Sequence, residues 1–186
     1  MKYTLEEFKT QIKASTLKVG DKLITEDIAG KAIFEVAEIR KKNIYMVRKY
    51  CLPRDYDKTH NDLDDFLNGE YLDSLPKELK DIMGKRKGSR IFVPWFNEVF
   101  GDVEDCDWAD KSKGKQWKIF EKTIKKIRLD GEKYGYARWY WLASPYIGTS
   151  AGFCSVTTSG AADYNGASNS SGVLPCFKIN REAVAE

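Results

Sequence analysis

A weakly charged segment near the C-terminus, from Ser144 to Val173, constrains this chain more than any other part of its sequence. Asp163 is its only charged residue, although 32% of the residues in the 186-residue chain are charged. Gly, Ser, Ala and Asn are abundant in the segment, and such a composition is also found in disordered linkers. Apolar runs flank the segment on both sides and its own residues alternate in polarity, which favours an ordered structure.

The alternation predicts a β-hairpin on a rigid base. In the run 151–157 the even-numbered side chains point to one face, which suits a core, and the odd-numbered side chains point to the other. Residues 159–160 read Ser-Gly and signal a turn, after which residues 161–165 would form the returning strand. The runs 138–143 and 173–179 are apolar enough to be central strands that hold both ends. A polar loop region on such a base suits recognition.

The rest of the chain predicts short helices and antiparallel strands. Thr4 and Glu7 read as a capping box for an amphipathic helix within residues 1–16. The β-rich runs 32–39 and 43–47 predict an antiparallel pair. The further expected elements are two short helices within 61–84, a strand at 89–93, a helical turn at 94–101 and a helix over 117–127 with Trp117, Phe120, Ile124 and Ile127 on one apolar face.

These elements predict an α+β protein that forms one domain over residues 1–186. Its N-terminal helix lies within 1–16, and its C-terminal strand and ligand-display region spans 138–180. No internal repeat and no Pro- or Ser-rich linker divides the sequence.

Charge and hydropathy argue against two classes of partner. The 31 Lys and Arg residues nearly balance the 28 Asp and Glu residues, which leaves a formal charge of +3 and no electrostatic footprint for nucleic acid. No apolar run approaches the roughly 20 residues that a membrane span needs. The N-terminal sequence MKYTLEEFKT carries acids where a signal peptide is apolar. We expect a protein made in the bacterial cytoplasm without a signal peptide and without membrane insertion, with assembly into a virion as one destination.

The cysteines and the single histidine offer little for catalysis. The spacing of the four cysteines fits neither a zinc site nor a disulfide scaffold, so reduced thiols are expected, with a Cys154–Cys176 bridge left open. His60 is the only histidine and lies in a polar stretch that reads as a solvated loop, which excludes a histidine-based metal cluster. No cofactor is expected. Calcium needs six or more oxygen ligands, usually with several carboxylates, and the C-terminal segment offers only Asp163.

Two short motifs carry a family resemblance. The runs Trp141-Leu142-Ala143-Ser144-Pro145 and Gly172-Val173-Leu174-Pro175 resemble the C-terminal anchors of a domain of unknown function that is widespread in Gram-positive gut bacteria and their phages. Its members typically read W-W-L-R-S-P, then a Ser/Asn/Gly-rich stretch, then G-V-R-P-A or G-V-A-P-A. The resemblance runs from about Leu17 onward. Ala143 and Leu174 depart from the usual residues, so any contact made by an arginine at those positions is not carried over.

The resemblance implies a C-type-lectin-like fold, the fold of formylglycine-generating enzymes and of the variable proteins of diversity-generating retroelements. Such a domain has small mixed or antiparallel sheets, short helices, a long loop-rich C-terminal region and neighbouring termini. Lys, Glu, Gln, Met and Trp cannot arise by adenine-directed diversification of Asn codons, and none occurs in the segment 144–173. A Gly- and Ser-rich loop explains much of that pattern as well, so both explanations stay open.

We therefore expect a non-enzymatic receptor-binding or display protein of phage or prophage origin, whose partner is a cell-surface protein or glycan. Tyr and Phe offer rigid contact area, while Ser, Thr and Asn supply adaptable hydrogen bonds, as in antibody loops. For Phe153, packing in the core is the competing interpretation. The expected ligand-binding residues are Tyr146, Thr149, Ser150, Phe153, Ser155, Thr157, Asp163, Tyr164, Asn165 and Asn169.

Two alternatives come from other classes. A formylglycine-generating-enzyme-like oxidase would need a reactive cysteine pair, for which Cys154 and Cys176 are the only local candidates. The inward direction predicted for Cys154 favours an inert thiol instead. The other alternative is a structural subunit, either a homo-oligomer or a part attached to a larger phage structure.

Overall fold

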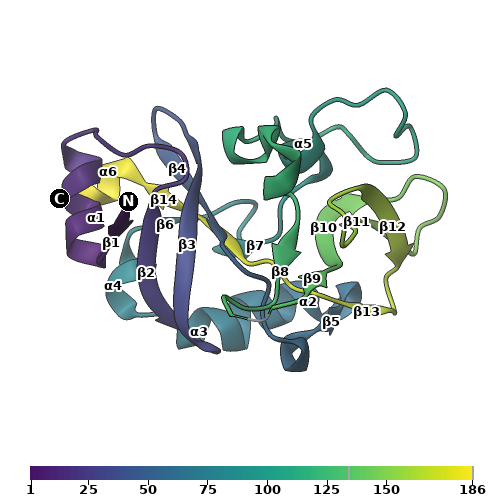
Figure 1. Ribbon diagram of the computed structural model, residues 1–186, viewed down its shortest axis with the longest axis horizontal. Helices are drawn as coiled ribbons and strands as arrows, with labels where there is room; N and C mark the ends of the chain where they lie inside the picture. The colour runs from purple at the N-terminus through teal and green to yellow at the C-terminus, as the bar shows by residue number, and fades with distance from the viewer. Residues whose placement is uncertain (134, 186) are drawn as a thin grey trace. The chain divides into compact units, whose positions relative to one another are not determined.

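The computed structural model describes residues 1–133 and 135–185 (Figure 1). Its architecture is mixed α and β, with several small, mainly antiparallel sheets and short helices, which confirms the expected α+β class. The chain divides into two compact units. Unit 1 consists of Met1–Lys49, Asp64–Phe92 and Pro175–Glu186, and unit 2 consists of Tyr50–Leu63 and Val93–Leu174.

Unit 1 is built on a seven-stranded sheet in the order β1-β2-β3-β4-β14-β6, with β7 also paired to β14. The strands predicted over 32–39 and 43–47 are present as β3 and β4. The predicted run 173–179 contains β14, which is central because it pairs with three other strands. The strands are β1 (Lys2–Tyr3), β2 (Lys22–Asp27), β3 (Gly30–Ile39), β4 (Asn43–Arg48), β6 (Met83–Gly84), β7 (Ile91–Phe92) and β14 (Cys176–Asn180).

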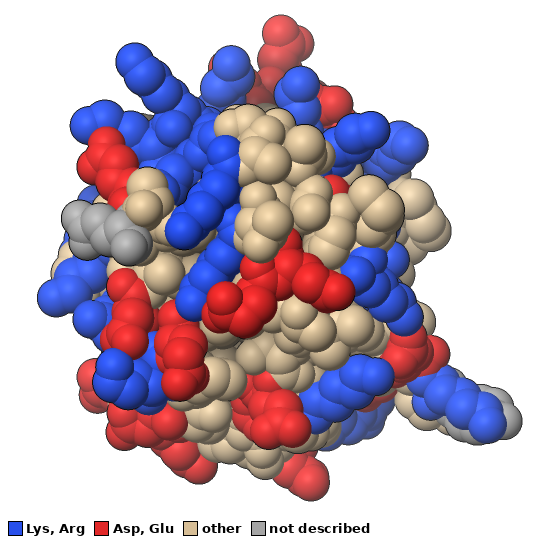
Figure 2. Space-filling model, turned by 90° about the vertical axis from the view of Figure 1, so that its left-hand side faces the viewer, with Lys and Arg blue, Asp and Glu red and all other residues tan. Residues whose placement is uncertain are grey.

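Helices α1 (Leu5–Lys13) and α6 (Arg181–Ala185) are in contact within unit 1, so the first and last helices of the chain are neighbours (Figure 1). The predicted capping box is confirmed, since Thr4 N donates to Glu7 Oε2 (2.8 Å) and Glu7 N donates to Thr4 Oγ1 (3.4 Å). The face of the molecule drawn in Figure 2 carries basic and acidic side chains mixed with uncharged ones.

The helices predicted within 61–84 are present as four consecutive short elements. One of them supplies Tyr71, whose buried hydroxyl donates to Asp27 Oδ2 (2.9 Å), the same atom that accepts from Arg48 Nε (2.7 Å). Burial raises the pKa of Tyr71 well above its ordinary value, which keeps the hydroxyl a donor. The elements are α2 (His60–Phe66), the π-helical turn η2 (Leu67–Tyr71), α3 (Leu72–Ser74) and α4 (Lys77–Asp81).

Unit 2 contains a three-stranded antiparallel sheet in the order β10-β11-β12 and two two-stranded sheets, β13-β5 and β8-β9. The hairpin predicted in the C-terminal segment is confirmed as β11 and β12, so the linker interpretation is wrong. The strands are β5 (Lys58–Thr59), β8 (Arg128–Leu129), β9 (Ala137–Arg138), β10 (Tyr140–Pro145), β11 (Gly152–Val156), β12 (Ala162–Gly166) and β13 (Ser170–Ser171), and the helices are η1 (Arg54–Tyr56), α5 (Phe96–Phe100), η3 (Lys118–Glu121) and η4 (Thr123–Lys125).

The run 138–143 was expected to be a central strand, and this is wrong in part. Its strand β10 lies at the edge of the three-stranded sheet. On the other side of β10, irregular backbone takes the place of a strand: Trp141 N donates to Gly172 O (3.2 Å) and Ala143 N donates to Pro94 O (2.9 Å). These bonds satisfy polar groups that a further strand would otherwise have to pair.

The helix predicted over 117–127 is also wrong. Trp117 and Phe120 are fully buried, as expected, but the side chain of Ile124 is 69% exposed. Two 3₁₀ turns, η3 and η4, replace the helix because Lys122 between them is extended (φ −90°, ψ 122°). No described helix has the length and apolarity that crossing a membrane takes.

Candidate functional site

The register of the β11-β12 hairpin divides the expected contact residues between two faces. Cys154 lies opposite Tyr164, and Phe153 lies opposite Asn165. Side chains of directly opposed residues in an antiparallel pair project to the same face. Tyr164 is therefore on the face of Cys154, and Asn165 is on the face of Phe153. The ten expected residues do not form one contact surface.

The first surface is an aromatic cluster of Trp108, Tyr146 and Tyr164. The two tyrosine rings are stacked with centroids 4.0 Å apart, and the Trp108 ring lies 5.2 Å from the Tyr164 ring and 6.3 Å from the Tyr146 ring. Tyr164 is 45% exposed and the neighbouring Ile147 is 64% exposed. Because Ile147 N donates to Trp108 O (2.7 Å), the loop after β10 is tied to the segment that carries Trp108.

Two small residues shape this cluster. A Cβ added to Gly148 would overlap the ring of Tyr146, so the chain passes directly over that ring. A Cβ added to Gly152 would lie 3.1 Å from Tyr146 Cβ and 3.2 Å from Thr149 Oγ1, which places Thr149 beside the cluster. Thr149 and Ser150 are exposed in the loop between β10 and β11, as expected.

On the opposite face of the hairpin, several expected contact residues are either buried or hydrogen-bonded within the protein. Ser155 is 1% exposed, so its prediction as a surface contact is wrong, and its Oγ has no hydrogen-bond partner among the described residues. Thr157 Oγ1 is engaged in the turn, where it accepts from Ala161 N (3.1 Å). Asp163 Oδ1 accepts from Tyr164 N (2.7 Å). Local pairing thus occupies side chains that were expected to face a partner.

Phe153 is half-buried because it stacks on His60, with ring centroids 3.4 Å apart and the planes 10° from parallel. His60 was predicted to lie in a solvated loop, and this is wrong. Its Nε2 lies 3.1 Å from Leu142 O, and because a carbonyl oxygen only accepts, Nε2 carries the proton. Burial lowers the pKa of His60 to about 4, so the ring is neutral at physiological pH.

The second surface is a polar pocket of about 310 Å³. Asn165 is the only residue of the expected contact set that lines it. The pocket combines three segments that are distant in the sequence with the end of the hairpin, which is why sequence patterns did not reveal it. Its lining residues are Arg54, Asp57, Ala137, Arg138, Trp139, Thr158, Asn165, Ser170, Ser171 and Gly172.

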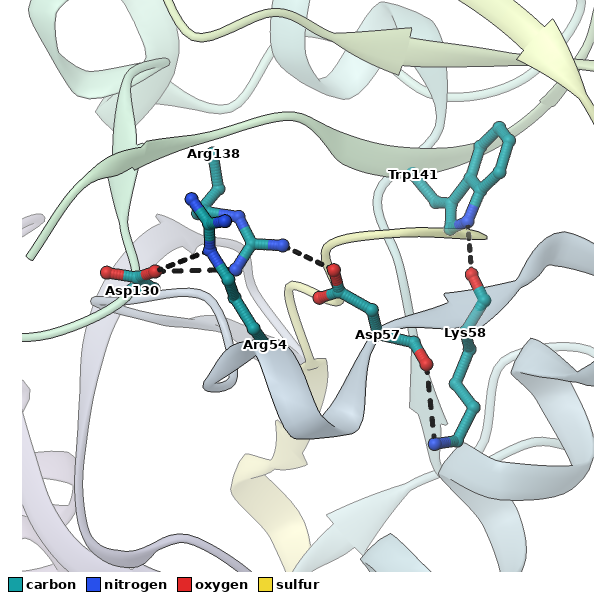
Figure 3. A network of polar contacts seen from close by, with 6 residues as sticks. All are labelled: Arg54, Asp57, Lys58, Asp130, Arg138 and Trp141. Atoms are coloured by element: carbon teal, nitrogen blue, oxygen red, sulfur yellow. Dashed lines mark hydrogen bonds and ion pairs between the residues drawn. The ribbon is translucent and has the colours of Figure 1, made fainter. Parts of the chain in front are cut away.

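A network of ion pairs joins the lining residues Arg54, Asp57 and Arg138 to Asp130 (Figure 3). Arg138 is 9% exposed on its side chain and donates to Asp57 Oδ2 and to Asp130 Oδ2 (3.3 Å). Arg54 Nε lies 3.7 Å from the same Asp130 oxygen, but the Arg54 side chain is 69% exposed. Arg138 therefore pairs with both carboxylates within the protein, whereas the Arg54 side chain is mostly exposed to solvent.

The comparisons with known proteins identify the family. A family model described as "Domain of unknown function (DUF6273)" matches residues 23–181. The chain belongs to the DUF6273 family. Searches of curated proteins and of solved structures each gave no significant match. The matched range includes the aromatic cluster and the polar pocket, so both surfaces belong to the DUF6273 domain.

Strand β10 of the DUF6273 domain holds three neighbouring segments. Trp141 Nε1 donates to Lys58 O (2.8 Å) (Figure 3), and Ala143 N donates to Pro94 O (2.9 Å). Ser144 Oγ accepts from Phe96 N (2.9 Å) at the start of α5, and Pro145 O accepts from Asp110 N (3.0 Å). The run 141–145 thus fixes the segments from which both surfaces are built.

The four cysteines of the DUF6273 domain are reduced, as their spacing predicted, and Cys154 and Cys176 form no disulfide. Cys51, Cys154 and Cys176 are buried, and Cys106 is partly exposed. Burial raises the pKa of Cys154 to about 12, and its Sγ donates to Pro145 O (3.4 Å). A protonated thiol is a poor nucleophile. Among the described residues, no three His, Cys, Asp or Glu side chains form a group that could hold a metal ion.

Proposed function

We propose that this protein is a non-enzymatic ligand-binding domain that presents the aromatic cluster, together with the loop 147–151, to a protein or glycan on a cell surface. The observation that carries the proposal is the stack of the half-buried Tyr146 and the exposed Tyr164 against the half-buried Trp108. Tyr and Trp are enriched among the residues that dominate binding energy, because they offer large area with few rotatable bonds.

The construction of the cluster supports this proposal. Its rings come from the loop before β11, from β12 and from the segment that contains Trp108, and backbone hydrogen bonds join these segments. Rings that are already stacked lose little conformational freedom on binding, which favours affinity. An exposed apolar group rimmed by polar residues is a feature of interaction sites.

The proposal extends to fold and origin. We assign the domain a C-type-lectin-like fold, which its mixed α+β architecture, its neighbouring first and last helices and its ordered C-terminal hairpin support. We also propose a phage or prophage gene whose segment 144–173 is the variable region of a diversity-generating retroelement. Sequencing the surrounding DNA tests this: a nearby reverse transcriptase gene with an imperfect copy of the segment supports it, and the lack of both refutes it.

The alternative of a formylglycine-generating-enzyme-like oxidase has weaker support. That chemistry needs a cysteine that ionises readily, whereas burial holds the Cys154 thiol in its protonated form. Cys176 is buried as well. The binding role is therefore the function that we propose.

Binding of the fluorescently labelled protein to a panel of intact Gram-positive cells, measured by flow cytometry, tests the proposal. Tyr146→Ala and Tyr164→Ala should each weaken binding by at least about tenfold, the loss of a side chain worth more than 1 kcal/mol. Ile124→Ala is the matched control, since Ile124 is another exposed apolar residue of unit 2 that lies outside the cluster. Absence of binding across the panel, or equal losses in the control, would overturn the proposal.

A further inference from the structure

We propose that the polar pocket is a second binding site, and that it takes a saccharide unit carrying a carboxylate, such as a uronic or sialic acid, without a metal ion. Asn165 lines this pocket, whereas Tyr164 belongs to the aromatic cluster on the opposite face of the hairpin. The site is therefore separate from the surface proposed above and does not rest on it.

Trp139 supplies the apolar wall of the site. It lines the pocket and is 41% exposed, whereas its neighbours Tyr140 and Trp141 are fully buried. Trp139 directly precedes β10, and Asn165 of β12 lines the same pocket. A pyranose ring has an apolar C–H face that packs on such an indole ring and a hydroxyl rim that does not.

The polar side chains of the pocket offer both donors and acceptors, including Asp57 Oδ1, which has no hydrogen-bond partner among the described residues. Asn165 Oδ1 accepts from Gly166 N (2.8 Å) and Asn169 Nδ2 (2.6 Å), which leaves Asn165 Nδ2 to donate to a ligand. The exposed hydroxyls of Thr158 and Ser170 also line the pocket and can donate or accept. A ligand rich in oxygen acceptors and hydroxyls satisfies this set.

Arg54 gives the site an accessible positive group for an acidic ligand. Arg138 bonds to both Asp57 and Asp130, these bonds are largely enclosed, and Arg54 completes a set of two arginines and two aspartates that has no net charge. Arg54 is different, because its one ion pair within the described residues is long (3.7 Å) and its side chain is 69% exposed. Such surface pairs contribute little, so a ligand carboxylate can compete for the Arg54 guanidinium, with which it forms paired hydrogen bonds.

Size and composition argue against other anionic ligands. A volume of about 310 Å³ is at the small end of the range for small-molecule sites, about 300–1,000 Å³, and does not hold an extended peptide. Phosphate sites typically use a helix N-terminus or several converging backbone N–H groups. The pocket instead presents one available cation, one aromatic residue and several side-chain hydroxyl and amide groups, a combination that fits an acidic sugar.

The test compares methyl glucuronide with methyl glucoside, which differ only in the oxidation of one ring substituent. Both are titrated into the whole protein in EDTA, followed by saturation-transfer NMR and by the ¹H–¹⁵N signals of the tryptophan indoles and asparagine amides. We expect the glucuronide to bind with a dissociation constant in the millimolar range or below, and at least about tenfold (1.4 kcal/mol) more tightly than the glucoside. Sodium acetate, which offers the carboxylate alone, should bind at least as weakly as the glucoside.

Three variants assign the binding to named residues. Arg54→Gln should remove the preference for the glucuronide, and the exposure of Arg54 predicts an unchanged fold by circular dichroism. Trp139→Ala should weaken both sugars. Tyr164→Ala should leave sugar binding unchanged even where it abolishes cell binding, which separates this site from the aromatic cluster. Failure of glucuronide, galacturonide and N-acetylneuraminic acid alike to bind, acetate binding as tight as that of the glucuronide, or an unaltered preference in Arg54→Gln would each overturn the proposal.

Discussion

Replacing Gly172 with alanine should destabilise unit 2, because the backbone there leaves no room for a side chain. A Cβ at this position would come closer than 3.0 Å to the carbonyl oxygen of Trp139, a separation that real Cβ atoms essentially never show. The obstacle is backbone and cannot rotate away. The same two segments exchange two hydrogen bonds, from Gly172 N to Trp139 O (3.0 Å) and from Trp141 N to Gly172 O (3.2 Å), and both must lengthen if the chains separate.

The magnitude follows from these contacts. Overpacking typically costs about 1–3 kcal/mol, and each weakened hydrogen bond adds about 0.5–1.5 kcal/mol. Alanine also lowers the conformational entropy of the unfolded chain, which stabilises the folded protein by about 0.4–1 kcal/mol. The free energy of unfolding should therefore fall by about 2–4 kcal/mol, which lowers Tm by roughly 10 °C in a chain of this length.

Tryptophan fluorescence is the appropriate assay, since all five tryptophans lie in unit 2. Thermal and urea unfolding should be compared for the wild type, Gly172→Ala and the control Gly166→Ala. A Cβ on Gly166 would meet only Asn169 Nδ2, at an ordinary distance of 3.4 Å, so the control should change stability by less than about 1 kcal/mol. Equal stability of the two variants would refute the reasoning about the Trp139 carbonyl.

Three further predictions concern buried groups. The pKa of His60 is about 4 in the folded state and 6.5 in the unfolded state, so the unfolded state binds a proton first as the pH falls. The free energy of unfolding should therefore fall by roughly 2 kcal/mol between pH 6.5 and pH 4. Urea titrations should show this pH dependence in the wild type and not in His60→Gln. Asp27→Asn should cost about 3–5 kcal/mol in urea unfolding because it breaks the buried ion pair between Asp27 and Arg48 (2.7 Å). Asp81→Asn, which breaks the exposed pair of equal length with Lys77, should cost less than about 1 kcal/mol, and similar losses in the two variants would contradict this account. Mass spectrometry after brief iodoacetamide treatment should find Cys106 as the one modified cysteine of the folded protein, and modification of Cys154 would revive the oxidase alternative.

The elements that sequence reasoning predicted well are those fixed by neighbours in the chain. The capping box at Thr4 and Glu7 is a contact between residues three positions apart. The β11-β12 hairpin follows from alternation on both sides of a Ser-Gly turn, and alternation also assigned Cys154 correctly to the buried face. Short-range patterns of this kind decide local conformation before any tertiary contact forms.

The errors arose where distant segments decide the outcome. His60 is surrounded in sequence by polar residues, and only its stacking on Phe153 and its bond to Leu142 O enclose it. Ser155 is also buried, although the alternation of the hairpin assigned the odd-numbered positions to the face opposite the core. The apolar spacing over 117–127 matched a helix, yet the bond from Trp117 N to Glu98 O and the extended Lys122 divert the chain. None of these contacts has a signature in local sequence.

The candidate surfaces were only partly accessible to sequence reasoning for the same reason. Tyr146 and Tyr164 were expected contact residues, but Trp108, with which their rings associate, was not among them. The polar pocket brings Arg54 and Trp139 together with the hairpin, and these residues are more than eighty positions apart in the chain. The mixed composition of the segment 144–173 indicated recognition without showing that two surfaces share it.

The alternation of β12 has an evolutionary consequence. Tyr164 and Asn165 are adjacent in the chain but serve opposite faces of the hairpin. A point substitution at either position can therefore retune one surface while the other is inherited intact. Insertion of a single residue in this strand would move the side chains that follow it to the opposite face, so both surfaces would change at once. Selection should therefore tolerate substitutions in β12 far more readily than changes in its length.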